Sequence, residues 1–455
     1  MVPLAREAPL AVKPPAASSA AAAKSLLASA PSPGSNLTPP LTPVEEEDGA
    51  RIIPVLDGAH SKVPPLWAAQ LDGPSECSLP LKYRYGQDGS RIEYGRGAWS
   101  NVYSAISIDH AASLATSPPQ TPTRGSSASS PMLGPRNSHT STSSSSSSSG
   151  STHTIVYAVK VASGRLAYDA VSAEADILTF LHRIPGSTAH VVPFHGYIAS
   201  EHAIVMTAIP LSFASYIKTR AKDAAAVFNT RTMFEPVLGM ATWLSFADKL
   251  VEGLRWMHEA GVVHGDIKPQ NILLRRRVPS ISSSNNSGGP TTATTLNSSG
   301  TIDDTAANSF DLLFIDFTSS LYSHGSSVAL NSTASSRLAT SLPFTAPELL
   351  SISAMTVPPT PAPSSDIFAL ALTLVAAAIG YGEVYPGLER HRALALARDG
   401  HHVIDYVRAG EQGTRIPHKG VVERVISPAV LKDADSRVTA EHWLGIVRGE
   451  IAALA

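Results

Sequence analysis

Cysteine is almost absent from this chain: its 455 residues contain one, Cys77. A single cysteine excludes an internal disulfide and a zinc site with several cysteine ligands, and it fits a reducing intracellular compartment, cytoplasmic or nuclear. An excess of one charge is missing too, because 35 Lys and Arg residues face 37 Asp and Glu residues. With a formal net charge of −2, the chain lacks the field that would favour nucleic acid or an anionic membrane as a partner.

Long hydrophobic runs are also missing. The most apolar one extends from Ile367 to Ile379, which is shorter than the roughly 20 residues that a membrane-spanning helix needs. We therefore expect no membrane span, and we interpret the run as a helix buried in a large core. The N-terminal residues lack the continuous apolar segment of a secretory signal. They are rich in alanine, as in a transit peptide, but their prolines would break an amphipathic helix.

Ser, Thr, Pro and Ala are concentrated in three stretches with too few apolar side chains to offset the entropy cost of folding. We expect residues 1–80 to form a disordered tail, and residues 107–153 and 276–308 to be low-complexity insertions in a folded domain. The tail carries Ser-Pro and Thr-Pro pairs before an acidic cluster, which are either phosphorylation sites or plain linker. The rest of the chain suffices for one domain of two lobes.

The strongest functional signal is the run His264 to Asn271, with the sequence HGDIKPQN. It places a carboxylate, an ammonium and a carboxamide (Asp266, Lys268 and Asn271) at spacings of two and three residues. Such an aspartate can orient a hydroxyl and accept its proton, the lysine can neutralise phosphate charge, and the asparagine can hold a metal ion. The run resembles the catalytic loop of eukaryotic protein kinases, usually written H-R-D-L-x-x-x-x-N. Lys268 is a feature of the Ser/Thr-specific members.

A glycine turn between two predicted strands precedes this loop in the sequence. Gly95 and Gly97 would let backbone amides approach a phosphate closely. The turn resembles the glycine-rich loop of protein kinases, with Ser100 standing where a third glycine is usual. The same resemblance implies that Val102, two residues further on, faces adenine.

A lysine then stands in the middle of an apolar strand, predicted at residues 155–161. Alternation places Ala158 and Lys160 on one face of it. A lysine among apolar residues is costly unless it is paired, the alternative being a side chain that reaches water at the strand edge. Residues 169–182 read as a helix with Glu174 on its apolar stripe, where a glutamate either lies at the border of the stripe or pairs with a buried cation. The spacing from Glu174 to Leu178 and Leu181 resembles the kinase helix C, and on this resemblance we predict that Glu174 pairs with Lys160. The strand resembles the kinase V-A-I-K strand, whose lysine holds the α- and β-phosphates.

Two further stretches complete the expected nucleotide site. Residues 203–210 resemble the strand that leads into the hinge between kinase lobes. This resemblance puts Met206 at the gatekeeper position and implies that backbone groups at Ala208 and its two neighbours bond to adenine. Later, a short apolar run predicts a buried strand that ends at Asp316, a good position for coordinating Mg²⁺. It resembles the D-F-G motif, with Thr318 in place of glycine.

Three residues near the C-terminal end support the fold rather than an activity. Ala346-Pro347-Glu348 resembles the end of a kinase activation segment, and the resemblance implies that Glu348 pairs with Arg437. Asp366, which opens the apolar run, resembles the buried aspartate that braces the catalytic loop.

One departure from the family pattern bears on regulation. Gly265 stands where most regulated kinases have an arginine, which reads an activation-loop phosphate through charge-assisted bonds. We therefore expect activity without such a phosphate. If a phosphate there did matter, Arg275 to Arg277 would be the first cations to consider.

The sequence thus predicts an α+β, two-lobed protein-kinase-like fold, with a small β-rich N-lobe at 81–210 and a larger helical C-lobe at 211–455. The expected function is transfer of the γ-phosphate of Mg·ATP to Ser or Thr hydroxyls of protein substrates. One alternative is a pseudokinase that acts as a nucleotide-binding scaffold, and another is a kinase-fold enzyme acting on small molecules. The complete set of charged groups favours the active enzyme, since pseudokinases typically lack at least one, and the Ala-Pro-Glu motif favours protein substrates.

Overall fold

The computed structural model describes residues 73–108, 155–277, 309–322, 341–350, 360–381, 384–385 and 387–454. Residues 1–72, most of both predicted insertions and the hydroxyl-rich part of the predicted activation segment lie outside these ranges. The disorder expected of the tail and the insertions therefore stays a prediction. All of the described residues belong to one compact unit, residues 63–455.

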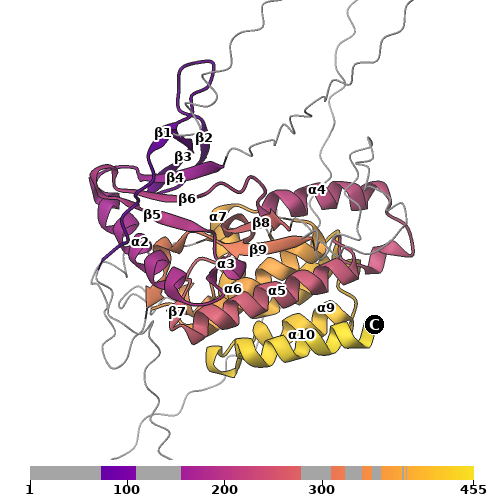
Figure 1. Cartoon of the computed structure of the whole chain (residues 1–455). Helices are drawn as coiled ribbons and strands as arrows, with labels where there is room; N and C mark the ends of the chain where they lie inside the picture. The colour runs from indigo at the N-terminus through magenta and orange to yellow at the C-terminus, as the bar shows by residue number, and fades with distance from the viewer. Residues whose placement is uncertain are drawn as a thin grey trace, which may run out of the picture. The chain divides into compact units, whose positions relative to one another are not determined.

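The first part of this unit is an antiparallel sheet of six strands in the order β1-β3-β4-β6-β5, with β2 also paired to β3 (Figure 1). Its strands are β1 (Leu81–Tyr83), β2 (Glu93–Arg96), β3 (Ser100–Ser107), β4 (Val156–Ala162), β5 (Phe194–Ile198) and β6 (Ala203–Thr207). Strand β4 alternates as predicted: Tyr157 and Val159 join an apolar cluster on one face, whereas Lys160 pairs with a helix on the other.

That helix, α2 (Tyr168–Arg183), lies against the sheet and matches the helix predicted over residues 169–182 (Figure 1). Val171 and Leu178 are fully buried on its inner face, and Glu174 is buried beside them. The short helix α3 (Ser187–His190) follows and leads into β5. Because of the helical periodicity, the Glu174 carboxylate points to the face of the sheet that carries Lys160.

Residues 75–77, which the sequence analysis assigned to the disordered tail, are part of the fold, so the fold begins before residue 81 and the predicted boundary is wrong by several residues. Cys77 N–H donates to Tyr197 O at 3.0 Å, and Tyr197 N–H donates to Ser75 O at 2.8 Å, so the stretch adds to the edge of the sheet at β5. Gly196 has φ +126°, and a Cβ on it would lie 2.6 Å from the Cα of Cys77. The close approach of these two backbones thus requires glycine at 196.

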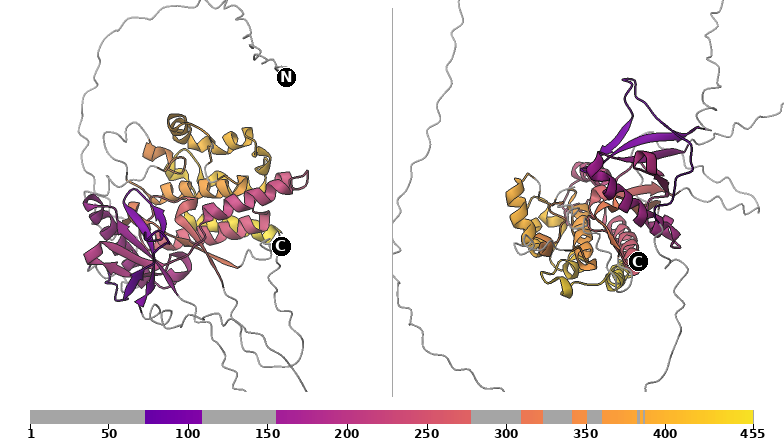
Figure 2. Two further views of the ribbon diagram at one scale, coloured as in Figure 1. Left: turned by 90° about the horizontal axis from the view of Figure 1, so that it is seen from above. Right: turned by 90° about the vertical axis from the view of Figure 1, so that its left-hand side faces the viewer.

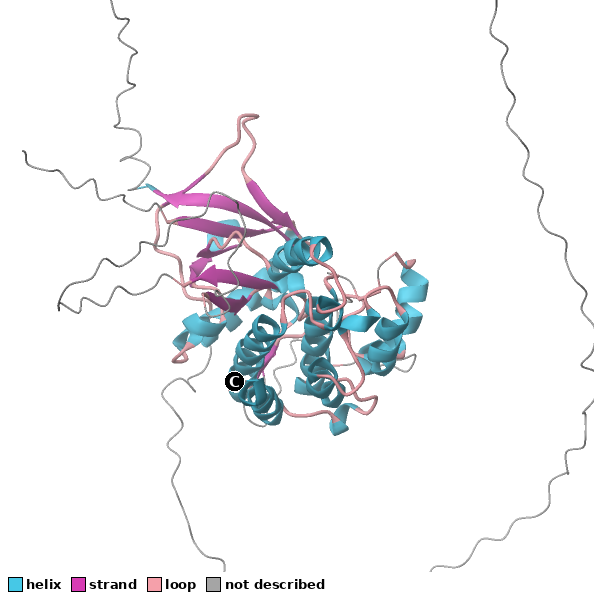
Figure 3. Ribbon diagram, turned by 90° about the vertical axis from the view of Figure 1, so that its right-hand side faces the viewer, coloured by secondary structure: helices cyan, strands magenta, loops and turns pink. Residues whose placement is uncertain are grey.

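The second part of the unit is mainly helical, and Figure 3 shows its helices beside the strands of the sheet. Its longer elements are α4 (Phe213–Ala226), α5 (Met240–Glu259), α6 (Pro363–Ile379), α7 (Arg390–Arg398), α8 (Val403–Ala409), α9 (Val421–Ile426) and α10 (Ala440–Leu454). Two small antiparallel ladders join β7 (Val262–Val263) to β10 (Leu321–Tyr322) and β8 (Ile272–Arg276) to β9 (Phe310–Phe314). Figure 2 gives two further views of the same arrangement.

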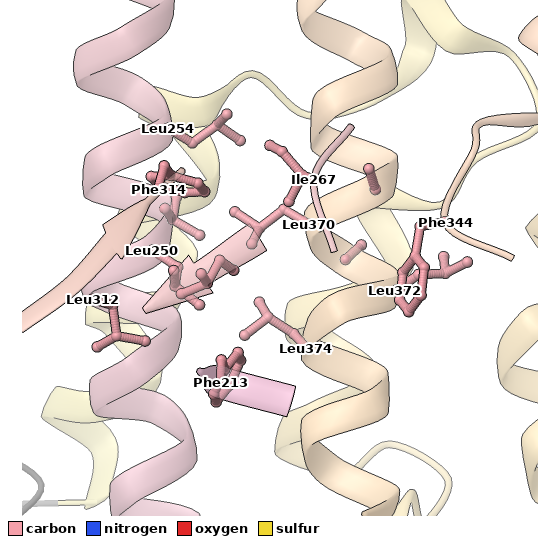
Figure 4. Packing of buried hydrophobic residues seen from close by; sticks show 14 of the residues in the cluster. Phe213, Leu250, Leu254, Ile267, Leu312, Phe314, Phe344, Leu370, Leu372 and Leu374 are labelled. Atoms are coloured by element: carbon pink, nitrogen blue, oxygen red, sulfur yellow. The ribbon is translucent and has the colours of Figure 1, made fainter. Parts of the chain in front are cut away.

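The core of the helical part is built around α6, the apolar run of the sequence. Every residue from Ser365 to Ile379 is buried, as predicted for this run. Side chains of α5, β9 and α6 gather between the two helices in Figure 4, among them Leu250, Leu254, Leu312, Phe314, Leu370 and Leu374. Burial of each such side chain stabilises the fold by roughly 1.5–3 kcal/mol. This packing fixes the loops that α5 and α6 carry at their ends.

The two parts are joined by the segment that follows β6, and a parallel bridge between Val191 and Phe314 adds a second link. The fold therefore has the predicted architecture, a small antiparallel N-terminal sheet followed by a helical C-terminal part. Strands β3 and β8 end at Ser107 and Arg276, each one residue inside a range predicted as an insertion. Among the described helices, none combines the length and the apolar character that a membrane crossing requires.

Candidate active site

A buried ion cluster joins the sheet, α2 and the end of β9. Lys160 Nζ donates to Glu174 Oε2 at 2.6 Å and to Asp316 Oδ1 at 2.7 Å. Lys160 and Glu174 are 5% and 1% exposed, so the ammonium has exchanged water for two carboxylates. The predicted pairing of Lys160 with Glu174 is confirmed. Its second partner, Asp316, is 156 residues away in the sequence.

The charges in this cluster shift one another's pKa values. Burial alone would lower the pKa of Lys160, but the attraction of Asp316 and Glu174 outweighs it and raises that pKa above its usual range. Burial would raise the pKa of Asp316, but Lys160 holds it well below its usual range. Burial does raise the pKa of Glu174, against the opposing effect of Lys160. Lys160 is therefore charged at neutral pH, and Asp316 is its ionised partner.

The loop from His264 to Asn271 places its polar side chains around Asp266. Lys268 Nζ donates to Asp266 Oδ2 at 2.6 Å, and Asn271 Nδ2 donates to the same oxygen at 3.1 Å. Asn271 Nδ2 also donates to the backbone oxygen of Asp266 at 2.9 Å. The N–H of Ile315 donates to Asn271 O at 3.0 Å, which ties this loop to the strand end that carries Asp316.

Asp366 holds the backbone of the loop from His264 to Asn271, as predicted from the family resemblance. Its Oδ2 accepts from the N–H of His264 at 2.7 Å, and its Oδ1 accepts from the N–H of Gly265 at 2.9 Å. Asp366 is 1% exposed and lies in the first turn of α6, so the buried core helix sets the position of the loop.

The other predicted support is also present. Arg437 donates from both terminal nitrogens to the two carboxylate oxygens of Glu348, each at 2.8 Å. The same guanidinium donates to Ser364 O at 2.9 Å and is itself fully buried. The bidentate pair therefore joins the Ala-Pro-Glu segment to the start of α6.

Comparison with known proteins agrees with this geometry. The family model described as Protein kinase domain matches residues 156–444. This chain belongs to the protein kinase family. The kinase is also similar to mitogen-activated protein kinase kinase 10 of Arabidopsis thaliana, with 30% identity over 122 residues. That match covers 27% of this chain and 34% of the relative, so the kinase spans about a third of the relative's length.

The glycine turn of the kinase lies outside the residues that the family model matches, but the structure forms it. Gly95 of β2 is registered opposite Val102 of β3, Arg96 opposite Asn101, and Gly97 N–H donates to Ser100 O at 2.8 Å to close the hairpin. Val102 is registered opposite Lys160. Cross-strand partners project from the same face of a sheet, so Val102 and Lys160 share the face that α2 approaches.

The predicted hinge residues lie on the same sheet. Met206 of β6 is registered opposite Ala158 of β4, two residues from Lys160, so both side chains belong to the face that carries Lys160. The N–H of Ala208 donates to Val156 O at 3.0 Å. Its amide is therefore committed to the sheet, and the adenine contact expected at Ala208 is left to its carbonyl and to its neighbours.

Gly265, which replaces the arginine of the family pattern, has φ +78°. A Cβ at this position would lie 2.5 Å from Ser319 O, closer than side chains approach a backbone oxygen. The kinase therefore has no room for a side chain in this loop conformation. Arg275 and Arg277, considered as substitute cations, pair instead with Asp311, and Arg275 also donates to Thr188 O at 2.8 Å. Both guanidinium groups therefore contact one carboxylate in this structure, and their role as readers of an activation-segment phosphate stays a prediction.

Sequence reasoning missed one member of the ion cluster, the hydroxyl of Thr318. It lies 2.9 Å from Glu174 Oε2 and 2.7 Å from Asp316 Oδ1, and it accepts from Lys160 Nζ at 3.2 Å. The sequence shows only that glycine is replaced at this position. The one signal available was a residue able to form hydrogen bonds two positions after Asp316, the aspartate predicted to bind Mg²⁺.

Proposed function

We propose that this kinase is an active protein serine/threonine kinase that transfers the γ-phosphate of Mg·ATP to a hydroxyl of a protein substrate. One observation carries the proposal: two complete clusters, Lys160–Glu174–Asp316 and Asp266–Lys268–Asn271, are linked by the Ile315–Asn271 backbone bond. They supply the cation, the base and the metal ligands that phosphoryl transfer needs.

Each cluster has a role that follows from its charges. Lys160, held by Glu174, would bond to the α- and β-phosphates, and the amides of the turn at Gly95 and Gly97 would approach the same phosphates. Val102, Ala158 and Met206 form the apolar face that adenine would meet, because they share one side of the sheet. Backbone groups around Ala208 would fix the edge of the base.

The donor set also fits magnesium. Asp316 and Asn271 offer a carboxylate and a carboxamide oxygen, and Mg²⁺ is usually held by one or two carboxylates together with substrate phosphates. The Asn271 nitrogen donates to Asp266, which leaves its oxygen as the atom for a cation. The bound ion would neutralise charge that develops on the phosphates. No group of three or more His, Cys, Asp or Glu suited to a metal occurs among the described residues.

The acceptor side of the site favours a serine or threonine substrate. Lys268 Nζ bridges Asp266 Oδ2 and Ser341 Oγ at 2.6 and 2.7 Å. Ser341 belongs to the segment that ends in Ala-Pro-Glu, so Lys268 couples the proposed base to the surface where a peptide would lie. Asp266 would orient the acceptor hydroxyl and accept its proton. Lys268 would offset phosphate charge beside it.

Binding of Mg·ATP tests this site without requiring turnover. Saturating ligand should stabilise the wild-type protein by about 2.7 kcal/mol at a hundredfold excess over Kd. Lys160→Met should abolish the increase in Tm, while Lys218→Met, the same change at an exposed position of α4, should keep it. Absence of any increase for the wild type at millimolar Mg·ATP contradicts both the active kinase and the pseudokinase. An increase without phosphate transfer identifies the pseudokinase.

A further inference from the structure

Thr318 occupies an unusual place in the ion cluster. It is 8% exposed and lies in a short 3-10 helix, Phe317–Ser319, directly after Asp316. Asp316 has a left-handed backbone, with φ +65°, whereas Thr318 is not among the described residues with positive φ. The backbone at 318 therefore does not require glycine, and a side chain is accommodated there without strain.

The hydroxyl of Thr318 sits between three charged groups. A hydroxyl has one proton, so it donates to Glu174 Oε2 or to Asp316 Oδ1 at any moment, and it accepts from Lys160. The neighbouring N–H of Phe317 donates to the other oxygen of Glu174 at 3.2 Å. Both oxygens of Glu174 are thus held by the segment that carries Asp316. This network ties α2 to the proposed metal-binding segment.

The bonds to Asp316 leave its carboxylate accessible. Oδ1 receives both Lys160 and Thr318, yet the side chain as a whole retains 38% exposure. The hydrogen bonds to Oδ1 therefore orient the Asp316 carboxylate, and they leave Oδ2 for a ligand. Hydrogen bonds to a charged acceptor are also stronger than those between neutral groups, which makes this orientation firm.

We propose that Thr318 is a positioning residue for the kinase site: its hydroxyl holds Asp316 and Glu174 in place before Mg·nucleotide binds. The inference rests on the proposed function, because it names the ligand whose binding is prepared. Glycine at this position has no side chain and could not make these bonds. Threonine in place of glycine at 318 therefore has two effects: it adds the hydrogen bonds of its hydroxyl, and it reduces the conformational freedom of the backbone.

Three variants separate positioning from simple support of the fold. Thr318→Val keeps the shape and removes the hydroxyl, whereas Thr318→Ser retains it. Thr373→Val is the matched control, because Thr373 is fully buried in α6 and its hydroxyl bonds only within the helix, to Ala369 O at 2.9 Å. The readout is Kd by isothermal titration with ADP as a turnover-free probe, with and without Mg²⁺. The variants' Tm values are recorded alongside.

Thr318→Val should bind Mg·ADP about tenfold more weakly than wild type, and the loss should shrink when Mg²⁺ is withheld. Thr318→Ser should restore the affinity, and Thr373→Val should lower Tm without changing Kd. Equal or tighter binding by Thr318→Val overturns the positioning role alone. Tighter binding would mean that the hydroxyl competes with the metal for Asp316. If the wild type does not bind Mg·ADP in the titration, both the proposed function and the positioning role are contradicted.

Discussion

Replacing Gly265 by alanine should destabilise the kinase strongly, although the change adds one methyl group. Two costs combine. A left-handed backbone such as φ +78° costs an L-residue roughly 1–2 kcal/mol relative to glycine. The new Cβ would lie 2.5 Å from Ser319 O, and displacing that backbone adds about 1–3 kcal/mol, the range for overpacked sites.

The expected total is about 2–5 kcal/mol, which corresponds to a decrease in Tm of roughly 5–15 °C for a domain of this size. Displacement of Ser319 would also pull on Thr318 and Asp316, so Mg·ATP affinity should fall. Thermal unfolding followed by circular dichroism measures the first effect. Gly265→Arg, which restores the residue of the family pattern, should be at least as damaging, because it has the same Cβ.

The control is Gly445→Ala, at an exposed position of α10 where a Cβ meets nothing within 4 Å. Alanine is the better helix former, so this variant should be neutral or slightly more stable, by up to about 1 kcal/mol. If Gly265→Ala unfolds at the same temperature as wild type, the left-handed loop and its contact with Ser319 are not required, and the reasoning fails.

Two further stability effects follow from single contacts. Gly196→Ala should lower Tm, because its φ is +126° and the new Cβ would lie 2.6 Å from Cys77 backbone atoms; unchanged thermal unfolding would show that the edge stretch is not packed there. Burial alone would raise the pKa of Asp311, but bonds from Arg275 and Arg277 hold it below its usual value. This carboxylate therefore stabilises the fold above its ordinary pKa of about 4, and the effect is lost as the pH falls through its lower folded pKa. Asp311→Asn should lower Tm at pH 7 and progressively less below pH ~4, and a constant difference across that range would count against the pairing.

Some residues of the site were predictable because the sequence around them indicates their secondary structure and their burial. A lysine within the apolar strand β4 needs a carboxylate, and the apolar stripe of α2 offered Glu174. The bracing role of Asp366 was predicted from the resemblance to protein kinases, and its place at the start of a fully apolar helix agrees with that role. Periodicity and the cost of burying a charge narrowed the alternatives for Lys160 and Glu174, and the resemblance to protein kinases chose between them.

Other contacts depend on backbone paths that no local pattern encodes. The contact of Gly265 with Ser319 O depends on the course of the segment after β9, and a glycine in sequence does not report the sign of φ. The pairing of Arg275 with Asp311 was not predicted, because Asp311 lies across an insertion, on the paired strand β9. The sequence showed only that Thr318 replaces a glycine of the family pattern. The contacts of its hydroxyl could not be predicted, because Glu174 and Lys160 lie on α2 and β4, far away in the sequence.

Transfer of labelled γ-phosphate from ATP with Mg²⁺ to a peptide library tests the central claim most directly. Wild type should label serine and threonine, and Asp266→Asn should reduce kcat by about 10²–10⁴-fold while still binding Mg·ATP. Wild type that binds Mg·ATP but transfers no phosphate, or equal transfer by wild type and Asp266→Asn, would contradict the account.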